Sequence, residues 1–389
     1  MNNDCSSSPE LGKDGKRRRE GEGGDATADR LSNLPDFIIH HILSFLDTKS
    51  AVQTSVLSRV WQCAWKHVPV LNVRSDSFQQ YSSFDRFVEN VLSLRHPFSV
   101  RSMSYAVYEH EEEEGEDEFV KVIKYALSHD TQQLAFTLSY VGEAEYGYRF
   151  SDLFGTNLNC SLKSLELGHV CIDSGLGSSG FQMLTTLELV LCLLASDQDG
   201  EFDPFSNFPC LKNLVMSHCR HLDIDMHGNE RRLKICGPQL LSLELELVSS
   251  SNMEIFAPRL KFFRLEHDLE SLNFSKLTLP SLDDAVIMIN DEVEFMEGNE
   301  GSVRQGVVSL FQGLSNVTTL QLDSNITLTL LVGFCLLQDL SSIFEFLEQQ
   351  ASPFTKLKTL MVKGDTVPYV LLNYFLKGSS STETAIEFV

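Results

Sequence analysis

The sequence predicts an α/β protein in which a short all-α domain of three helices is followed by a solenoid with a parallel β-sheet. Two observations predict this fold class. An L-x-x-L-x-L pattern recurs from Leu162 onward, and a helical segment near the N-terminus is apolar on nearly all sides. The chain has 389 residues, 42% of them hydrophobic, so it is long and apolar enough to bury a sizeable core.

Residues 1–28 consist mainly of Ser, Gly, Glu, Asp and Arg and have almost nothing to bury. We therefore predict a disordered tail. Within it, residues 16–19 read Lys-Arg-Arg-Arg. This run is either a nuclear import signal or a solvated charge cluster, because short basic motifs often match by chance.

The three-helix domain is predicted over residues 29–70. The first helix opens at Leu34-Pro35-Asp36, where proline suits the first turn because its missing N–H would have no partner there. Its apolar residues cover most of the circumference. They are Phe37, Ile38, Ile39, Ile42, Leu43, Phe45 and Leu46. Thr48 is the expected cap of the second helix, and the third helix carries Trp61 and ends near Pro69.

A first helix with so many apolar residues can pack one face within the trio and leave the other for a partner. The alternative is that all of these residues belong to a core shared with the repeats. Residues 71–130 should hold connecting helices and a first irregular repeat, with an exposed acidic loop at 109–118. The repeat solenoid is predicted over residues 131–376 and a C-terminal tail over 377–389.

The repeat unit accepts other apolar residues at its leucine positions. Its instances start at Leu162, Leu184, Leu211, Leu240, Leu260, Leu282, Val317 and Leu357. The first six starts lie 20–29 residues apart, the spacing of leucine-rich repeats, and the last two intervals are longer. In x-L-x-L both leucines point to one face of a strand. Because one repeat cannot bury that face alone, successive repeats should stack into a parallel sheet with a continuous core.

The residue between the last two apolar positions of each repeat should point away from the core. We take this outward row as a candidate target-binding surface. It contains Glu166, Glu188, Val215, Glu244, Arg264, Val286, Gln321 and Met361. Its early part is acidic, which favours a target with a basic segment. The alternative is that any one of these residues is merely a solvated strand position.

The N-terminal motifs resemble those of the F-box/leucine-rich-repeat proteins of plants, including the F-box/FBD/LRR type. The resemblance covers the whole short motif. It lies in residues 29–36, 42–46 and 54–59, in Trp61 and Trp65, and in Val68-Pro69. One departure is Val60, where the family usually has a basic residue before the tryptophan. Residues 354–389 resemble the opening of the C-terminal domain that often follows in this family.

The resemblance implies a non-catalytic substrate-recognition subunit of a Skp–cullin–F-box ubiquitin ligase, which needs no cofactor. The F-box would bind a Skp-type adaptor, and through it a cullin and a RING protein, while the repeats bind the target. The residues that we expect to contact the adaptor are Leu34, Pro35, Ile39, Ile42, Leu43, Leu57 and Trp61. The alternative is a repeat-based protein-binding scaffold that is not coupled to ubiquitination.

Composition argues against several other classes of function. The net charge of -23 repels nucleic acid and anionic lipid, so neither is an expected partner. Nine cysteines without a CxxC pair fit a reducing compartment, and no signal peptide is visible, so we expect a nuclear or cytoplasmic protein.

Two sequence signals could suggest an enzyme or a metal site, and neither fits. The glycines of residues 175–180 match G-x-G-x-x-G, but the next repeat strand follows where a dinucleotide site needs a helix, so a flexible loop is expected. His218, Cys219 and His221, with Cys210 and Cys236 nearby, match no common zinc spacing. We therefore expect neither a bound metal nor a catalytic site.

Overall fold

The computed structural model separates into two compact units, residues 1–104 and residues 105–389. It describes residues 31, 33–95, 100–110, 116–140, 148–155, 161–178, 180–195, 200–222, 231–250, 252–268, 274–290, 300–322, 351–362, 369–378 and 383–384. The tail predicted over residues 1–28, with its basic run, lies outside these ranges, as does most of the predicted C-terminal tail.

The first unit begins with the predicted three short helices. They are α1 (Asp36–Leu43), α2 (Thr48–Gln53) and α3 (Arg59–Ala64), with 3-10 turns η1 (Thr54–Val56) and η2 (Trp65–His67) after α2 and α3. Asp47, and not Thr48, caps α2, because its Oδ1 accepts a hydrogen bond from the Ser50 N–H at 2.8 Å. Thr48 is buried instead, and its hydroxyl accepts a 2.9 Å bond from the backbone N–H of Asn72.

The core of this trio is formed by side chains from α1, α3 and the turn after α3. Ile39 and Leu43 are one turn apart on α1 and point to the same side, where both are buried. Trp61 and Trp65 are buried with them, and the Trp61 indole N–H donates to the carbonyl of Leu31. The unit continues with strand β1 (Val70–Arg74), turn η3 (Ser75–Ser77) and the amphipathic helix α4 (Tyr81–Leu94).

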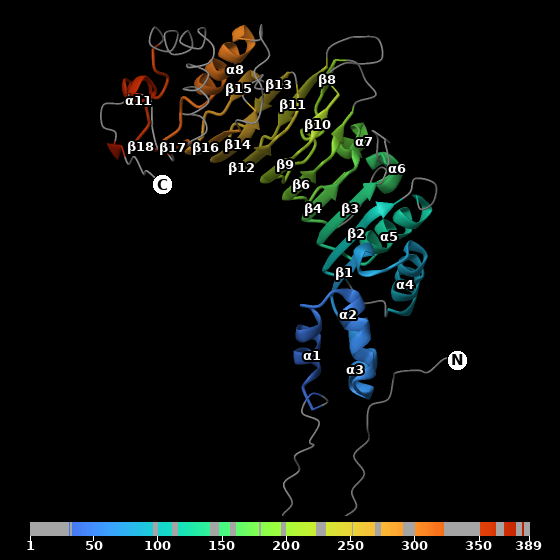
Figure 1. Ribbon diagram of the computed structural model, residues 1–389. Coiled ribbons are helices and arrows are strands. Elements are labelled where there is room, and N and C mark those ends of the chain that lie inside the picture. Colours follow the sequence, from blue (N-terminus) through green and yellow to red (C-terminus); the bar gives the residue numbers. More distant parts are fainter. Residues whose placement is uncertain are drawn as a thin grey trace, which may run out of the picture. The chain divides into compact units, whose positions relative to one another are not determined.

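The repeats begin after β2 (Ser102–His110), α5 (Glu116–Ser128), β3 (Gln133–Tyr140) and α6 (Phe150–Phe154). Residues 109–110 belong to β2 and residues 116–118 to α5, so these parts of the predicted acidic loop are not a loop, and residues 111–115 lie outside the described residues. Every neighbouring pair of the main sheet from β3 onward is parallel, in the order β3-β4-β6-β9-β12-β14-β16-β17-β18-β19 (Figure 1).

The main strands after β3 confirm the fold class, because those from β4 to β18 fall on the predicted repeats, whereas the last, β19, lies in the segment predicted as a C-terminal tail. They are β4 (Ser164–Gly168), β6 (Thr186–Val190), β9 (Asn213–Ser217), β12 (Ser242–Glu246), β14 (Phe262–Asp268), β16 (Asp284–Asn290), β17 (Thr319–Leu322), β18 (Thr359–Val362) and β19 (Glu383–Thr384). The inward leucines are at most 1% exposed, as with Leu165, Leu187 and Leu243. Each contributes roughly 1.5–3 kcal/mol by burial, so the alternating pattern holds the stack together.

Two smaller parallel sheets accompany the main sheet. One has the order β10-β7-β5, and the other has the order β15-β13-β11-β8 (Figure 1). The strands are β5 (Cys171–Ile172), β7 (Leu193–Leu194), β8 (Glu201–Phe202), β10 (Arg220–His221), β11 (Arg232–Cys236), β13 (Met253–Phe256) and β15 (Phe274–Thr278). We call the four-stranded one the second sheet.

In the described residues, three helices lie among these strands. Helix α7 (Ser174–Ser178) occupies the glycine-rich segment for which we expected a loop. The Asp173 carboxylate accepts a 2.9 Å hydrogen bond from the Gly175 N–H, and a Cβ on Gly175 would lie 2.8 Å from that of Ser151. These glycines thus serve close packing. Helix α8 (Glu300–Gly313), between β16 and β17, explains one of the longer repeat intervals, and α11 (Tyr369–Leu376) follows β18.

A repeated turn follows four of the main strands. Its first residue has a positive φ in His169, Leu191, His218 and Leu247. Each of these residues donates its N–H to a carbonyl of the next main strand, at 2.7–3.0 Å. A buried residue follows at each turn. The thiols of Cys192 and Cys219 donate to the carbonyls of Leu167 on β4 and Leu189 on β6, in the preceding repeat, both at 3.3 Å. These cysteines are therefore structural parts of the turn.

Candidate functional site

The first unit presents an unusual number of large apolar side chains to solvent. We call this set the helical apolar surface. It comprises Leu31, Phe37, Ile42, Phe45, Leu46, Val56, Leu57 and Val60. The most exposed are Val56 at 86% and Phe45 at 77%. Side chains this exposed add little to the packing of the helices, so folding alone does not account for them. Exposed apolar side chains in this number make the helical apolar surface the candidate binding site of the first unit.

The structure divides the seven residues predicted to contact an adaptor. Ile42 and Leu57 are exposed members of the helical apolar surface. Pro35 is also exposed, and Leu34 is half-buried at the start of α1. These four side chains can be reached by a partner.

The other three predicted contacts are placed in the interior. Ile39, Leu43 and Trp61 are 1%, 0% and 3% exposed, so their side chains hold the helices together and do not face solvent. The two most exposed residues of the helical apolar surface, Phe45 and Val56, were not among the predicted contacts; they lie in the turn after α1 and in η1. Helical periodicity carries no information about such positions.

The second unit aligns the predicted outward row across its main sheet. In register, Glu166 pairs with Glu188, Glu188 with Val215, and Val215 with Glu244. The row continues through Arg264, Val286, Gln321 and Met361. All of these side chains are half-buried, whereas the residues on either side of each are buried in the core. The structure therefore brings residues of distant repeats into one continuous row.

The acidic part of the row is electrostatically unfavourable by itself. Burial raises the pKa of the Glu188 carboxyl, and the negative charges of Glu166 and Glu244 raise it further. Like charges on neighbouring strands destabilise a sheet. By contrast, Arg264 further along the row has a carboxylate 3.6 Å away, on Glu266. The row is thus acidic at β4, β6 and β12 and changes character at β14.

The Glu188→Gln variant is expected to be more stable than the parent at neutral pH by about 0.5 kcal/mol, a gain kept small by solvent screening. Folding raises the pKa of Glu188 above its ordinary 4.5, so the ionised carboxylate opposes folding when the pH is above the raised pKa. The penalty is relieved as the pH falls through the raised folded value towards 4.5. Thermal denaturation at pH 7.5 and pH 4.5 should therefore show the gain at the higher pH alone.

The cysteine and histidine cluster considered for a metal is dispersed by the fold. Cys219 and His221 are buried, whereas Cys210 and His218 are exposed. Among the described residues, no three His, Cys, Asp or Glu side chains are grouped so that they could hold a metal ion. Burial, and to a lesser extent the neighbouring Asp203, raises the pKa of the Cys236 thiol to about 12. This thiol is therefore protonated near neutral pH. No helix within the described ranges could span a membrane.

Comparison with known proteins identifies the first unit. The F-box domain model matches residues 31–72, which include all three short helices and the helical apolar surface. The expectation from the N-terminal motifs is therefore confirmed.

The longer matches are to proteins of Arabidopsis thaliana. FBD-associated F-box protein At5g60610 is 28% identical over 71% of this chain and 68% of its own length. Putative F-box/FBD/LRR-repeat protein At4g13965 is 34% identical over 52% of this chain and 45% of its length. F-box/LRR-repeat protein 25 is 28% identical over 61% of this chain and 86% of its length. The chain spans 54% and 59% of two further F-box/LRR relatives. The chain thus carries an F-box domain followed by stacked repeats, and it is similar to plant proteins named F-box/LRR-repeat and FBD-associated F-box proteins.

Proposed function

We propose that this chain is the substrate-recognition subunit of a Skp–cullin–F-box ubiquitin ligase. The observation that carries the proposal is the helical apolar surface, which lies within the matched F-box domain and leaves Phe45 and Val56 largely exposed. F-box domains generally bind Skp-type adaptors, and covering these side chains would remove the cost of their hydration. The adaptor would link the chain to a cullin and a RING protein.

The repeats would supply the target-binding surface through the outward row. Each of its residues is half-buried, so contact with a target requires no unfolding of the sheet. The chain would act by proximity: a bound target experiences a high effective concentration of the charged ubiquitin-conjugating enzyme. The chemistry takes place on other subunits, in the nucleus, the cytoplasm or both.

Affinity purification of the full chain from plant cells tests this proposal against the alternative of an uncoupled scaffold. We expect a Skp-type adaptor and a cullin to co-purify with the chain. With proteasome inhibition, ubiquitinated proteins should be enriched in the same fraction if modification leads to degradation. Recovery of repeat-bound proteins without any adaptor or cullin would support the scaffold instead.

A further inference from the structure

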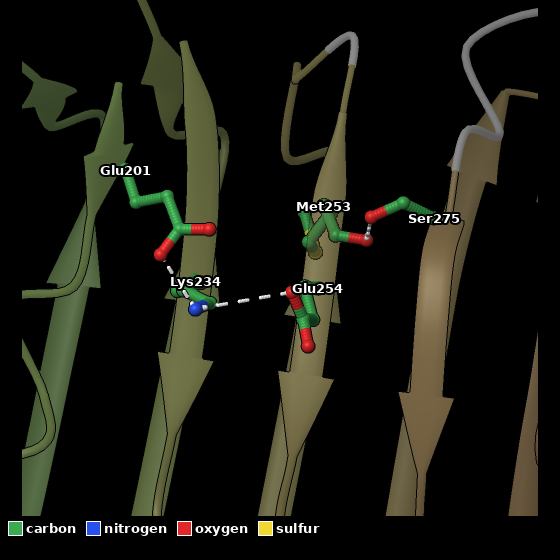
Figure 2. A network of polar contacts seen from close by, with 5 residues as sticks. All are labelled: Glu201, Lys234, Met253, Glu254 and Ser275. Carbon is green, nitrogen blue, oxygen red and sulfur yellow. Dashed lines mark hydrogen bonds and ion pairs between the residues drawn. The ribbon is translucent and has the colours of Figure 1, made fainter. Parts of the chain in front are cut away.

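The carboxylates of the main sheet and those of the second sheet have differently charged neighbours. On the second sheet, Lys234 on β11 lies 2.6 Å from the Glu201 carboxylate of β8 and 4.0 Å from that of Glu254 on β13 (Figure 2). The next register partner of Glu254 is Lys276 on β15. Charges of opposite sign thus alternate from strand to strand, as they must if neighbouring strands are to stabilise each other.

The outward row of the main sheet has the opposite arrangement. Glu166 and Glu188 are direct register partners, and Glu244 lies two strands beyond Glu188 with Val215 between them. Among the described residues, no ion pair joins any of these three carboxylates to a cation. On the main sheet two carboxylates are therefore paired directly with each other, and the first cation of the row is Arg264, the register partner of Glu244 on β14.

The acidic part of the outward row ends at β14. Arg264 on β14 lies beside Glu266, and its guanidinium also contacts the Met288 sulfur at 3.9 Å. On β16, the outward residues Val286 and Met288 are half-buried and uncharged. A ligand that crosses the strands along the row from β4 to β16 therefore meets three carboxylates first, then Arg264 with Glu266 beside it, and then the uncharged side chains of β16.

We propose that this face of the sheet binds an extended segment of a partner protein with Lys or Arg at alternate positions, followed by a large apolar residue. Neighbouring strands are about 4.8 Å apart, so β4 to β12 spans roughly 14 Å. Alternate residues of an extended chain are about 6.8 Å apart, so three basic residues at alternate positions cover the same distance. The apolar residue, about three positions further on, reaches Val286 and Met288. The bound segment would belong to the target of the proposed ligase subunit, and calling that protein a target rests on the proposed function.

The probe is a fluorescein-labelled nonapeptide of serine with Lys at its first, third and fifth positions and Leu at its eighth, titrated with the full chain by fluorescence anisotropy. The Glu166→Gln, Glu188→Gln, Glu244→Gln variant should bind about tenfold more weakly, since charge-paired contacts are removed without loss of volume. A matched variant with Glu89→Gln, Asp152→Asn and Glu201→Gln loses the same charge from other elements and should bind within about twofold of the parent. Equal binding by the two variants would overturn the proposal, because attraction would then come from net charge alone.

Two further titrations test which segment binds this face of the main sheet. Replacing the peptide leucine by serine should weaken binding several-fold, and no change would refute contact with Val286 and Met288. Replacing the chain's own basic residues 16–19 by alanine should leave the affinity unchanged. Tighter peptide binding by that variant would mean that the chain's own tail occupies the face, against the assignment to a partner. Adaptor capture serves as a separate readout, so failure of the peptide assay with intact adaptor binding leaves the proposed ligase role standing.

Discussion

The Phe45→Ala, Val56→Ala double variant is expected to lose capture of a Skp-type adaptor while both units stay folded. These two side chains are 77% and 86% exposed, so truncating them removes little packing from the chain itself. Each buried large apolar side chain contributes about 1.5–3 kcal/mol to association, so together they should account for at least a roughly hundredfold change in affinity. Titration of the purified full chain with adaptor by calorimetry measures that loss.

The matched control for this variant is Met183→Ala with Phe256→Ala. Both side chains are large, apolar and about half exposed, and both lie in the second unit. We expect unchanged adaptor affinity and an unchanged melting curve. If the control and the F-box variant lost adaptor equally, exposed apolar area in general would explain the binding, and the helical apolar surface would lose its special role.

The parallel sheet could be predicted in some detail because its signal is periodic. Alternating residues on a strand must face opposite sides, so Leu187 and Leu189 had to be inward and Glu188 outward. The register was also implied, because each repeat places its leucines at equal positions. The pattern also placed Glu166, Glu188 and Glu244 in one acidic row. What it could not provide was which carboxylates have a cation nearby, as Glu201 has in Lys234, because that depends on contacts formed in the fold.

The F-box contacts were harder to assign because a helix that is apolar on nearly all sides does not say which side is inward. The spacing of Ile39 and Leu43 did hold the answer: residues four apart share a face, and this face is buried where α1 packs on α3, the helix that carries Trp61. The choice of Asp47 over Thr48 as a cap was within reach as well, since both residue types cap helices. Only the structure shows that Thr48 is already engaged by Asn72.

Trp61→Ala should also abolish adaptor capture, but for a different physical reason. Trp61 is 3% exposed, and its indole N–H donates to Leu31, so its loss leaves a large cavity and removes a tether for the chain before α1. Truncations of this kind cost about 3–5 kcal/mol, which is a large share of the stability of so small a helical domain. We therefore expect the three helices to unfold.

Hydrogen exchange separates this outcome from a lost contact. In Trp61→Ala the amides of α1 and α3 should lose protection, whereas those of β4 to β16 should keep it, because the two units are separately compact. In Phe45→Ala, Val56→Ala both sets should stay protected although adaptor binding is equally lost. Trp61→Phe, which keeps most of the buried volume, should recover both protection and capture in large part. Full protection of α1 in Trp61→Ala would show instead that Trp61 reaches the adaptor directly, as a residue of the binding surface and not of the core.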